Sequence, residues 1–314
     1  VSSNPTSSLD AGDLAFVTGD SNLKFYNGSS WTSIAPGIAN VVDDSTPQLG
    51  GNLDLNSNSI TGTGNLDIAN GTIKLDGNYP TGTCNVALGD NALGSGSLSG
   101  DFNTAVGTNA LLANTSADAN TAIGRSSLCS NTTGNCNTGL GMNALLGNTE
   151  GFGNVAVGRS SMVANTTGDN NVAVGQNSLV SNTTADNNTA VGTCSLTANT
   201  TGNANTAVGI TSLQANTTGA NNVAVGRCAL YSNTTASDNT AVGVSSMGLT
   251  TTGCQNTAVG QQSLRTNSTG DNNTALGFYA LCTNSTADNN TAVGFCSLKT
   301  NSTGANNTAV GRFA

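Results

Sequence analysis

Aspartate is the residue type whose spacing in this 314-residue sequence comes closest to a chemical site. Five aspartates are separated by multiples of 17 residues: Asp118, Asp169, Asp186, Asp271 and Asp288. A row of carboxylates could bind Ca²⁺, which prefers oxygen ligands, so Asp169, Asp186, Asp271 and Asp288 are weak metal candidates. Other periods place Asn, Ala, Ser, Phe or Cys there, which interrupts the row. A solvated turn is the favoured interpretation, and we predict no metal and no cofactor.

The residue patterns that support catalysis are largely missing. The sequence has no histidine for a Ser-His-Asp triad and no motif that would activate a serine. Its eight cysteines lack metal-ligand spacing, which favours free thiols; disulfides stay an alternative, with Cys129–Cys136 and Cys282–Cys296 closest in sequence. Two carboxylates paired in a groove could still cleave a polysaccharide. The repeating coils of such enzymes, however, are wider and less regular than the strict sequence repeat of this chain suggests. We therefore predict that the protein is not an enzyme.

The composition favours an elongated repetitive protein. Only 8% of residues are charged and 4% aromatic, whereas 40 are glycine and 36% are hydrophobic. Residues 1–106 hold ten acidic and two basic residues, and residues 107–314 hold seven and six. The sequence contains no stripe of basic residues that could bind phosphate groups, so we expect no nucleic-acid partner. No apolar run reaches the roughly 20 residues of a membrane span, so we expect no membrane insertion.

A 17-residue repeat must position these side chains. Its reference glycine follows an aliphatic residue and precedes a Leu or Met by four residues. The glycine recurs after 18 residues once and after 17 residues thereafter, at Gly89, Gly107, Gly124, Gly141, Gly158, Gly175, Gly192, Gly209, Gly226, Gly243, Gly260, Gly277, Gly294 and Gly311. Ala-Val before it predicts one short strand, Ser-Leu after it a second, and Asn-Thr-Thr-Gly a turn. The predicted fold class is all-β, a parallel β-roll or β-solenoid of 17-residue coils stacked about 4.8 Å apart and roughly 60 Å long.

Asparagine forms two further regular columns. One column follows the reference glycine by seven residues and, from Asn114 onward, is broken only at Thr250. The other column precedes the reference glycine by four residues, at Asn120, Asn137, Asn154, Asn171, Asn188, Asn205, Asn222, Asn239, Asn256, Asn273, Asn290 and Asn307. In a stack, each amide would bond to the amides above and below it and satisfy buried polar groups of the turns. We therefore predict structural ladders at both columns.

A 17-residue coil is thin and buries little apolar surface, whereas fixing its 17 residues costs conformational entropy. We expect one Val and one Leu or Met per coil to be buried, and a second buried surface to be needed. The small Ala column and the small Ser or Ala column would let neighbouring chains approach closely. These columns predict that the chain packs in parallel with copies of itself.

The repeat Asn-Thr-Ala-Val-Gly…Ser-Leu…Asn-Thr-Thr-Gly resembles the repeats of phage tail-fibre-type proteins and of related bacterial surface fibres. Residues 154–158, Asn-Val-Ala-Val-Gly, are also similar to the Ser-Val-Ala-Ile-Gly core of the heads of trimeric autotransporter adhesins. The resemblance covers residues 85–314 and implies a parallel homotrimer; the adhesin heads are left-handed β-rolls. The adhesin repeat is shorter than the 17-residue repeat of this chain, and the two differ at the turn of residues 165–168.

The sequence before the array is not repetitive. Residues 1–36 are interpreted as a small N-terminal β domain, with predicted strands at 14–17, 23–26 and 31–34. Residues 37–84 are interpreted as a β-stalk or linker that leads to the array at 85–314. Residues 43–60 resemble a segment of marine and cyanobacterial phage tail fibres, which favours a virion fibre over a cell-surface adhesin.

These resemblances imply a structural fibre protein, in the first place a phage tail fibre that attaches a virion to its host cell. The expected location is the virion. Expected partners are copies of the chain itself in a homotrimer, a host-cell surface receptor or glycan, and other virion proteins at the N-terminal part. The alternative is a bacterial trimeric adhesin or an extracellular fibril, with or without glycans, at the bacterial surface. A remote alternative is an ice-binding solenoid, although no Thr-x-Thr row runs through the array.

Overall fold

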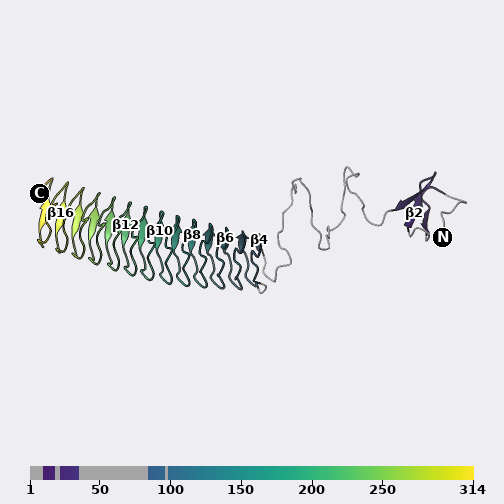
Figure 1. Cartoon of the computed structure of the whole chain (residues 1–314), viewed down its shortest axis with the longest axis horizontal. Coiled ribbons are helices and arrows are strands. Elements are labelled where there is room, and N and C mark those ends of the chain that lie inside the picture. The colour runs from purple at the N-terminus through teal and green to yellow at the C-terminus, as the bar shows by residue number, and fades with distance from the viewer. Residues whose placement is uncertain (1–9, 18–21, 35–83, 96–97) are drawn as a thin grey trace. The chain divides into compact units, whose positions relative to one another are not determined.

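The computed structural model describes residues 10–17, 22–34, 84–95 and 98–314. Within these residues every regular element is a strand, and no helix is present (Figure 1). The chain divides into two compact units, residues 1–69 and 70–314, and each holds one sheet. The predicted all-β class is thus confirmed for the described part of the chain.

A three-stranded antiparallel sheet forms the described part of the first unit. Its strands are β1 (Leu14–Val17), β2 (Asn22–Tyr26) and β3 (Trp31–Ile34), in the order β1-β2-β3. Asn27 closes the β2–β3 turn, because its Oδ1 accepts the backbone N–H groups of Ser29 and Ser30 at 2.9 and 2.8 Å. The three predicted strands are confirmed. The predicted stalk of residues 37–84, with its segment 43–60, lies outside the described residues apart from Cys84.

A fourteen-stranded parallel sheet runs through the second unit (Figure 1). Each strand pairs with the strand one coil later, so that Ala190 lies opposite Ala207. Fourteen consecutive strands give thirteen coil-to-coil steps, which confirms the predicted β-solenoid. The strands are β4 (Val86–Leu88), β5 (Thr104–Val106), β6 (Thr121–Ile123), β7 (Thr138–Leu140), β8 (Val155–Val157), β9 (Val172–Val174), β10 (Thr189–Val191), β11 (Thr206–Val208), β12 (Val223–Val225), β13 (Thr240–Val242), β14 (Thr257–Val259), β15 (Thr274–Leu276), β16 (Thr291–Val293) and β17 (Thr308–Val310).

Each coil is extended only at its Thr/Val-Ala-Val segment, so the second strand predicted at Ser-Leu is wrong. We number the coil from its reference glycine, position 0, to the aliphatic residue at position 16; positions 2, 4 and 12 then take a left-handed backbone. In the coil of residues 192–208, Cys194, Leu196 and Ala204 have φ angles of 55°, 48° and 57°. A positive φ at leucine bends the chain into a turn, which a strand excludes. Bonds between coils form there nevertheless, since Leu196 N–H donates to Ser212 O at 3.0 Å.

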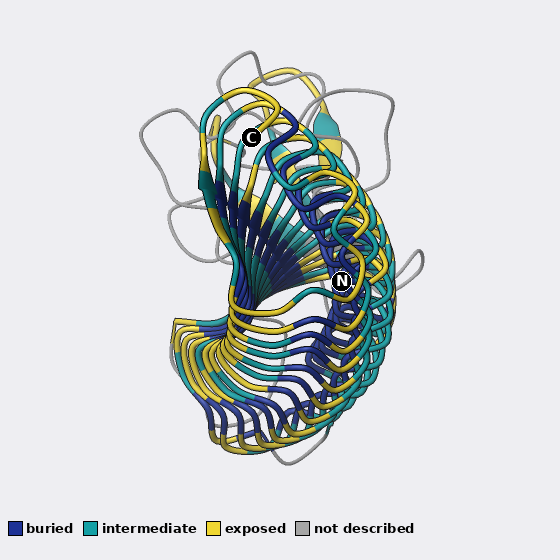
Figure 2. Cartoon of the chain, turned by 90° about the vertical axis from the view of Figure 1, so that its left-hand side faces the viewer, coloured by how far each residue is buried: buried dark blue, intermediate teal, exposed yellow. Residues whose placement is uncertain are grey.

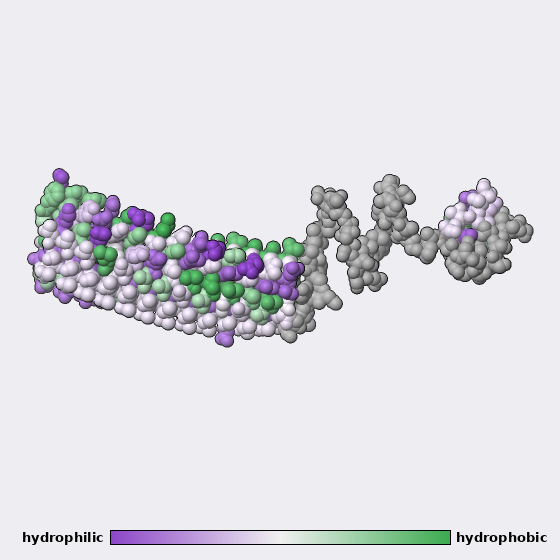
Figure 3. All heavy atoms as spheres, in the orientation of Figure 1, coloured by the Kyte–Doolittle hydropathy of each residue, from purple (hydrophilic) through white to green (hydrophobic). Residues whose placement is uncertain are grey.

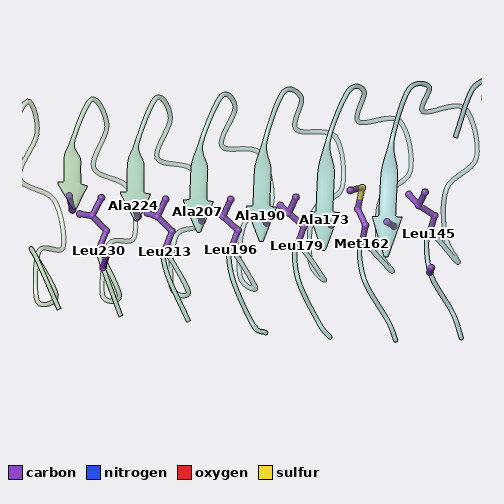
Figure 4. Packing of buried hydrophobic residues seen from close by; sticks show 14 of the residues in the cluster. Leu145, Met162, Ala173, Leu179, Ala190, Leu196, Ala207, Leu213, Ala224 and Leu230 are labelled. Atoms are coloured by element: carbon purple, nitrogen blue, oxygen red, sulfur yellow. The ribbon is translucent and has the colours of Figure 1, made fainter. Parts of the chain in front are cut away.

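The core is a file of small and aliphatic side chains inside the coils (Figure 4). Successive residues of a strand point to opposite sides, so the central Ala is buried and its two neighbours face outward. Ala190 and Leu196 are both 0% exposed and lie in register with their equivalents in the adjacent coils. Ser195 at position 3 is buried beside them. Viewed along the array, these buried segments stack on one another (Figure 2).

Two expectations about packing are wrong. The aliphatic residue at position 16 is only half-buried, because the inward place in the strand belongs to Ala. The Ala column and the Ser or Ala column lie inside the single chain, so they offer no surface to a neighbouring chain. The outward surface of the sheet consists instead of position 14, Thr or Val, and position 16, Val, Ile or Leu.

Candidate functional site

The predicted asparagine ladder at position 13 lies in the interior of the array. Asn120 to Asn290 are fully buried, and Asn307 is half-buried. The backbone N–H of each Asn donates to Oδ1 of the equivalent Asn one coil earlier; for Asn222 the acceptor is Asn205, at 3.0 Å. Asn222 Nδ2 also donates to Ala236 O at 2.8 Å, which ties the column to position 10 of the next coil. The column therefore joins three successive coils at each step.

The second ladder, at position 7, meets the first at the same carbonyl group. Asn216 Nδ2 donates to Asn199 Oδ1 at 2.8 Å and to Gly219 O at 2.9 Å. Gly219 O also accepts Asn205 Nδ2, from the position-13 ladder, at 2.8 Å. Because a buried amide is costly to leave unpaired, these bonds fix the stacking register of the coils. Both ladders are structural.

The position-7 ladder is broken at Thr250, which is fully buried. Threonine has no amide, so Asn233 Oδ1 finds no donor and Thr250 Oγ1 has no partner. On the other side of the break, Asn267 Nδ2 donates to Gly270 O at 2.7 Å, without the ladder bond of the other coils. This part of the array therefore holds two unpaired buried oxygens.

The carboxylate row proposed as a weak metal site lies at position 11, immediately before a bend near the surface. Asp169 N–H donates to Asp186 Oδ1 and Asp271 N–H donates to Asp288 Oδ1, both at 2.8 Å. Asn203 serves the same purpose, since its Oδ1 accepts Asp186 N–H at 2.8 Å. The row thus braces adjacent bends. Among the residues that the structure describes, no group of three or more His, Cys, Asp or Glu is placed to hold a metal ion.

The eight cysteines are free thiols in several different columns, so neither Cys129–Cys136 nor Cys282–Cys296 forms a disulfide. Burial raises the pKa of the Cys129 and Cys282 thiols. A raised pKa lowers the thiolate fraction at neutral pH, and the sequence offers no histidine to activate a thiol. The cysteines therefore supply no arrangement suited to nucleophilic catalysis.

An aromatic cluster occupies exposed positions of the last three coils. The rings of Phe278 and Phe295 are stacked, with centroids 5.5 Å apart and planes 6° apart, and Tyr279 packs edge-on against Phe278. Arg312 lies over the Phe295 ring at 5.5 Å, and Lys299 lies over the Tyr279 ring at 5.1 Å. Phe278 and Phe295 remain 38% and 42% exposed. Sequence reasoning missed this cluster, although phenylalanines one period apart were the available signal.

No helix in the described residues is long and apolar enough to cross a membrane. Comparison of the chain with protein-family models, with curated proteins and with solved structures finds no match.

Proposed function

We propose that this chain is a structural fibre protein that acts as a phage tail fibre in attachment to a host cell. The observation that carries the proposal is the division between constant and variable columns. Buried positions 4, 13 and 15 hold nearly the same residue in every coil, whereas the exposed position 1 changes from coil to coil. Such a stack keeps a rigid frame while its surface is free to fit a receptor.

The hydrogen bonding of the array supports a mechanical role. Successive coils are joined by strand pairs, by backbone bonds in the turns and by amides of the position-13 column, and most of them also by amides of the position-7 column. A stack held in this way resists bending and shear along its length, as a fibre must. We propose no catalytic role, because the sequence has no histidine and the thiols lack an activating base.

Within this proposal, the aromatic cluster is the surface suited to a host glycan. Sugar rings present flat C–H surfaces that pack on exposed aromatic rings, and Phe278 and Phe295 offer two rings at adjacent coils. Arg312 and Lys299 are placed beside these rings and could pair with acidic sugars.

Cell binding tests the proposal. The fluorescently labelled full chain is incubated with a panel of bacterial strains, including cyanobacteria, and bound label is measured by flow cytometry. We expect binding to some strains, lost by about 10-fold or more in the double variant Phe278→Ser/Phe295→Ser, which removes the hot-spot rings. Phe152→Ser, a matched change at a phenylalanine that is 49% exposed outside the cluster, should bind like the unmodified chain. Absence of binding to every strain would contradict host attachment.

Immunogold labelling of source cultures separates the virion fibre from its alternative. Label on virus particles is the expected result. Label confined to bacterial surfaces would replace the tail fibre by an adhesin or extracellular fibril.

Ice binding is a second candidate, because the sheet presents a row of threonines to the outside. Ten of the fourteen strands have Thr at position 14, and Val interrupts the row in β4, β8, β9 and β12. Thr166 and Thr167 lie in a bend: the Thr166 hydroxyl donates to Thr183 O at 3.1 Å, while Thr167 is exposed. Inhibition of ice recrystallisation by the full chain would support this candidate, and inactivity would eliminate it.

A further inference from the structure

One coil of the array, residues 243–259, departs from the repeat at three consecutive positions. Gly248, Leu249 and Thr250 occupy its positions 5, 6 and 7. From Gly107 onward every other complete coil has a side chain at position 5, and position 6 is otherwise Ala, Ser, Thr or Gly. A sequence that follows its pattern elsewhere often breaks it at a functional site, so this coil is a candidate for one.

The missing side chain at position 5 leaves a hollow of about 140 Å³ on the surface, which we call the Gly248 hollow. Tyr231 and Arg265 are the exposed position-5 residues of the coils on either side, so their Cα atoms lie two coil spacings, roughly 10 Å, apart. The lining comes from three successive coils: Cys228, Tyr231, Ser245, Gly248, Leu249 and Arg265. The hollow therefore opens to solvent between a phenol ring and a guanidinium group.

The charged groups around the hollow are cations. No carboxylate lines it, and Arg265 has no acidic partner in the described part of the chain. A second guanidinium lies at its edge, since Arg227 Nη1 donates to Cys228 Sγ at 3.8 Å. An anion is therefore the ligand that this lining favours. Arginine suits a carboxylate best, because it can bind both carboxylate oxygens through parallel hydrogen bonds.

The apolar part of the lining favours a ring-shaped group. Tyr231 and Leu249 are 41% and 45% exposed, and the C–H faces of a sugar pack on such surfaces. Sites for drug-sized ligands measure about 300–1,000 Å³, so a hollow of about 140 Å³ holds one ring while the rest of a longer ligand stays outside. One residue of a polysaccharide meets both requirements.

The hollow and the aromatic cluster lie on the same side of the coil. Burial raises the pKa of the Cys282 thiol, and both Arg265 and Lys299 oppose the rise, so the two cations lie near the same thiol. Lys299 also lies over the Tyr279 ring of the cluster. Hydrophobic and hydrophilic patches are visible next to one another on the surface of the array in Figure 3. A polysaccharide that lies along this side of the array would meet both places.

We propose that the Gly248 hollow binds one uronate residue of an acidic polysaccharide, with its carboxylate on Arg265 and its ring beside Tyr231 and Leu249. The proposal rests on the attachment function proposed above, which supplies the choice of a glycan. It adds a second contact to the aromatic cluster and makes the receptor acidic, since a neutral sugar would leave the guanidinium groups unpaired.

Ligand-observed NMR with the full chain tests the proposal. Saturation transfer is measured with short oligosaccharides of galacturonate, glucuronate and mannuronate, and with a neutral glucose oligosaccharide of equal length. We expect at least one uronate oligosaccharide to bind about 10-fold or more tightly than the neutral one.

Gly248→Val fills the hollow and should weaken uronate binding about 10-fold or more. Its backbone is outside the left-handed region, a Cβ would lie 3.3 Å from the nearest atom, Ser245 O, and Val163 and Val180 occupy the same position in other coils. Thr197→Val, a matched control at position 5 of a coil without a hollow, should bind like the parent.

Arg265→Gln removes the charge and keeps the hollow open, so it decides the question if Gly248→Val fails to fold. It should also weaken uronate binding about 10-fold or more, without changing the weak binding of the neutral oligosaccharide. Arg159→Gln, the same change at an exposed arginine distant from the hollow, should have no effect.

Three results would overturn the proposal: no binding of any uronate oligosaccharide, equal binding of the neutral one, or uronate binding that survives Arg265→Gln or a folded Gly248→Val. Acetate that competes as well as the oligosaccharides would also overturn it, because a general anion site needs no ring. The cell-binding assay separates this failure from that of the proposed function. Cell binding without uronate binding would remove the hollow and leave host attachment standing, and uronate binding without cell binding would do the reverse.

Discussion

Thr250→Asn should stabilise the array by restoring the broken ladder. In an intact coil Asn216 Nδ2 donates to Asn199 Oδ1 at 2.8 Å and to Gly219 O at 2.9 Å. By analogy, an amide at position 250 would donate to Asn233 Oδ1 and to the carbonyl three residues later. Its own oxygen would accept the Asn267 amide, which at present donates to Gly270 O.

The expected gain follows from the unpaired oxygens. The substitution pairs the Asn233 oxygen and removes the unpaired Thr250 hydroxyl, and each such buried group costs about 1–3 kcal/mol. The slightly larger side chain and its lost rotamer freedom oppose part of this gain. We therefore expect the free energy of unfolding of this region to rise by about 2–4 kcal/mol.

Hydrogen exchange and urea unfolding measure the effect. Because a repeat array opens locally, amides of residues 233–270 should exchange more slowly, while distant coils change little. Thr252→Asn is the matched control: the same chemical change at an exposed position of the same coil should stay within about 0.5 kcal/mol. A neutral or destabilising T250N, alongside an unchanged T252N, would refute the ladder as a source of stability.

Three further predictions concern single positions. Gly192→Ala should lower the free energy of unfolding of the array by about 3 kcal/mol or more, because φ is 138° at this residue and an added Cβ would lie 2.7 Å from the carbonyl carbon of Gly209 in the next coil. Thermal unfolding measures the effect, and a melting temperature like that of the parent would contradict the prediction. Gly139→Ala should instead raise the free energy of unfolding by about 0.5–1 kcal/mol, since φ at Gly139 is not in the left-handed region. The Ser127 hydroxyl now donates to Gly139 O at 2.9 Å and must rotate away from the new methyl group, as the equivalent Ser195 hydroxyl does when it donates to Gly192 O. A clear loss of stability would show that the hydroxyl is fixed. Below pH 9, iodoacetamide should alkylate the exposed Cys136 well before Cys282, because burial raises the pKa of the Cys282 thiol. The difference between the two alkylation rates should narrow as pH rises. Equal rates, measured by peptide mass spectrometry, would contradict the burial of Cys282.

The period, the parallel stacking and both asparagine columns could be predicted because each leaves a sequence signal that nothing else explains. A glycine at fixed spacing marks a tight backbone approach, since every reference glycine except the last, Gly311, lies against the backbone of its equivalent one coil later. Asparagine at two fixed positions implies polar groups that must be satisfied away from water. These signals do not depend on side-chain direction.

The path of the coil between these marks could not be read in the same way. Leu196 with φ of 48° costs about 1–2 kcal/mol in the backbone, and its complete burial offsets that cost. Neither quantity is visible in the letters Ser-Leu, which suit a strand equally well. Hydrophobicity likewise favours Val191 over Ala190 for the interior, but the inward place of the three-residue strand falls on Ala190, which is fully buried. The aliphatic residue at position 16 is therefore left on the outer side of the sheet.

The native mass of the full chain, measured by light scattering and followed by electron microscopy of the same fraction, tests the fibre account most directly. The account predicts slender rods with about three times the 30.9 kDa mass of one chain. A folded particle of 30.9 kDa, unchanged by concentration or salt, would contradict it.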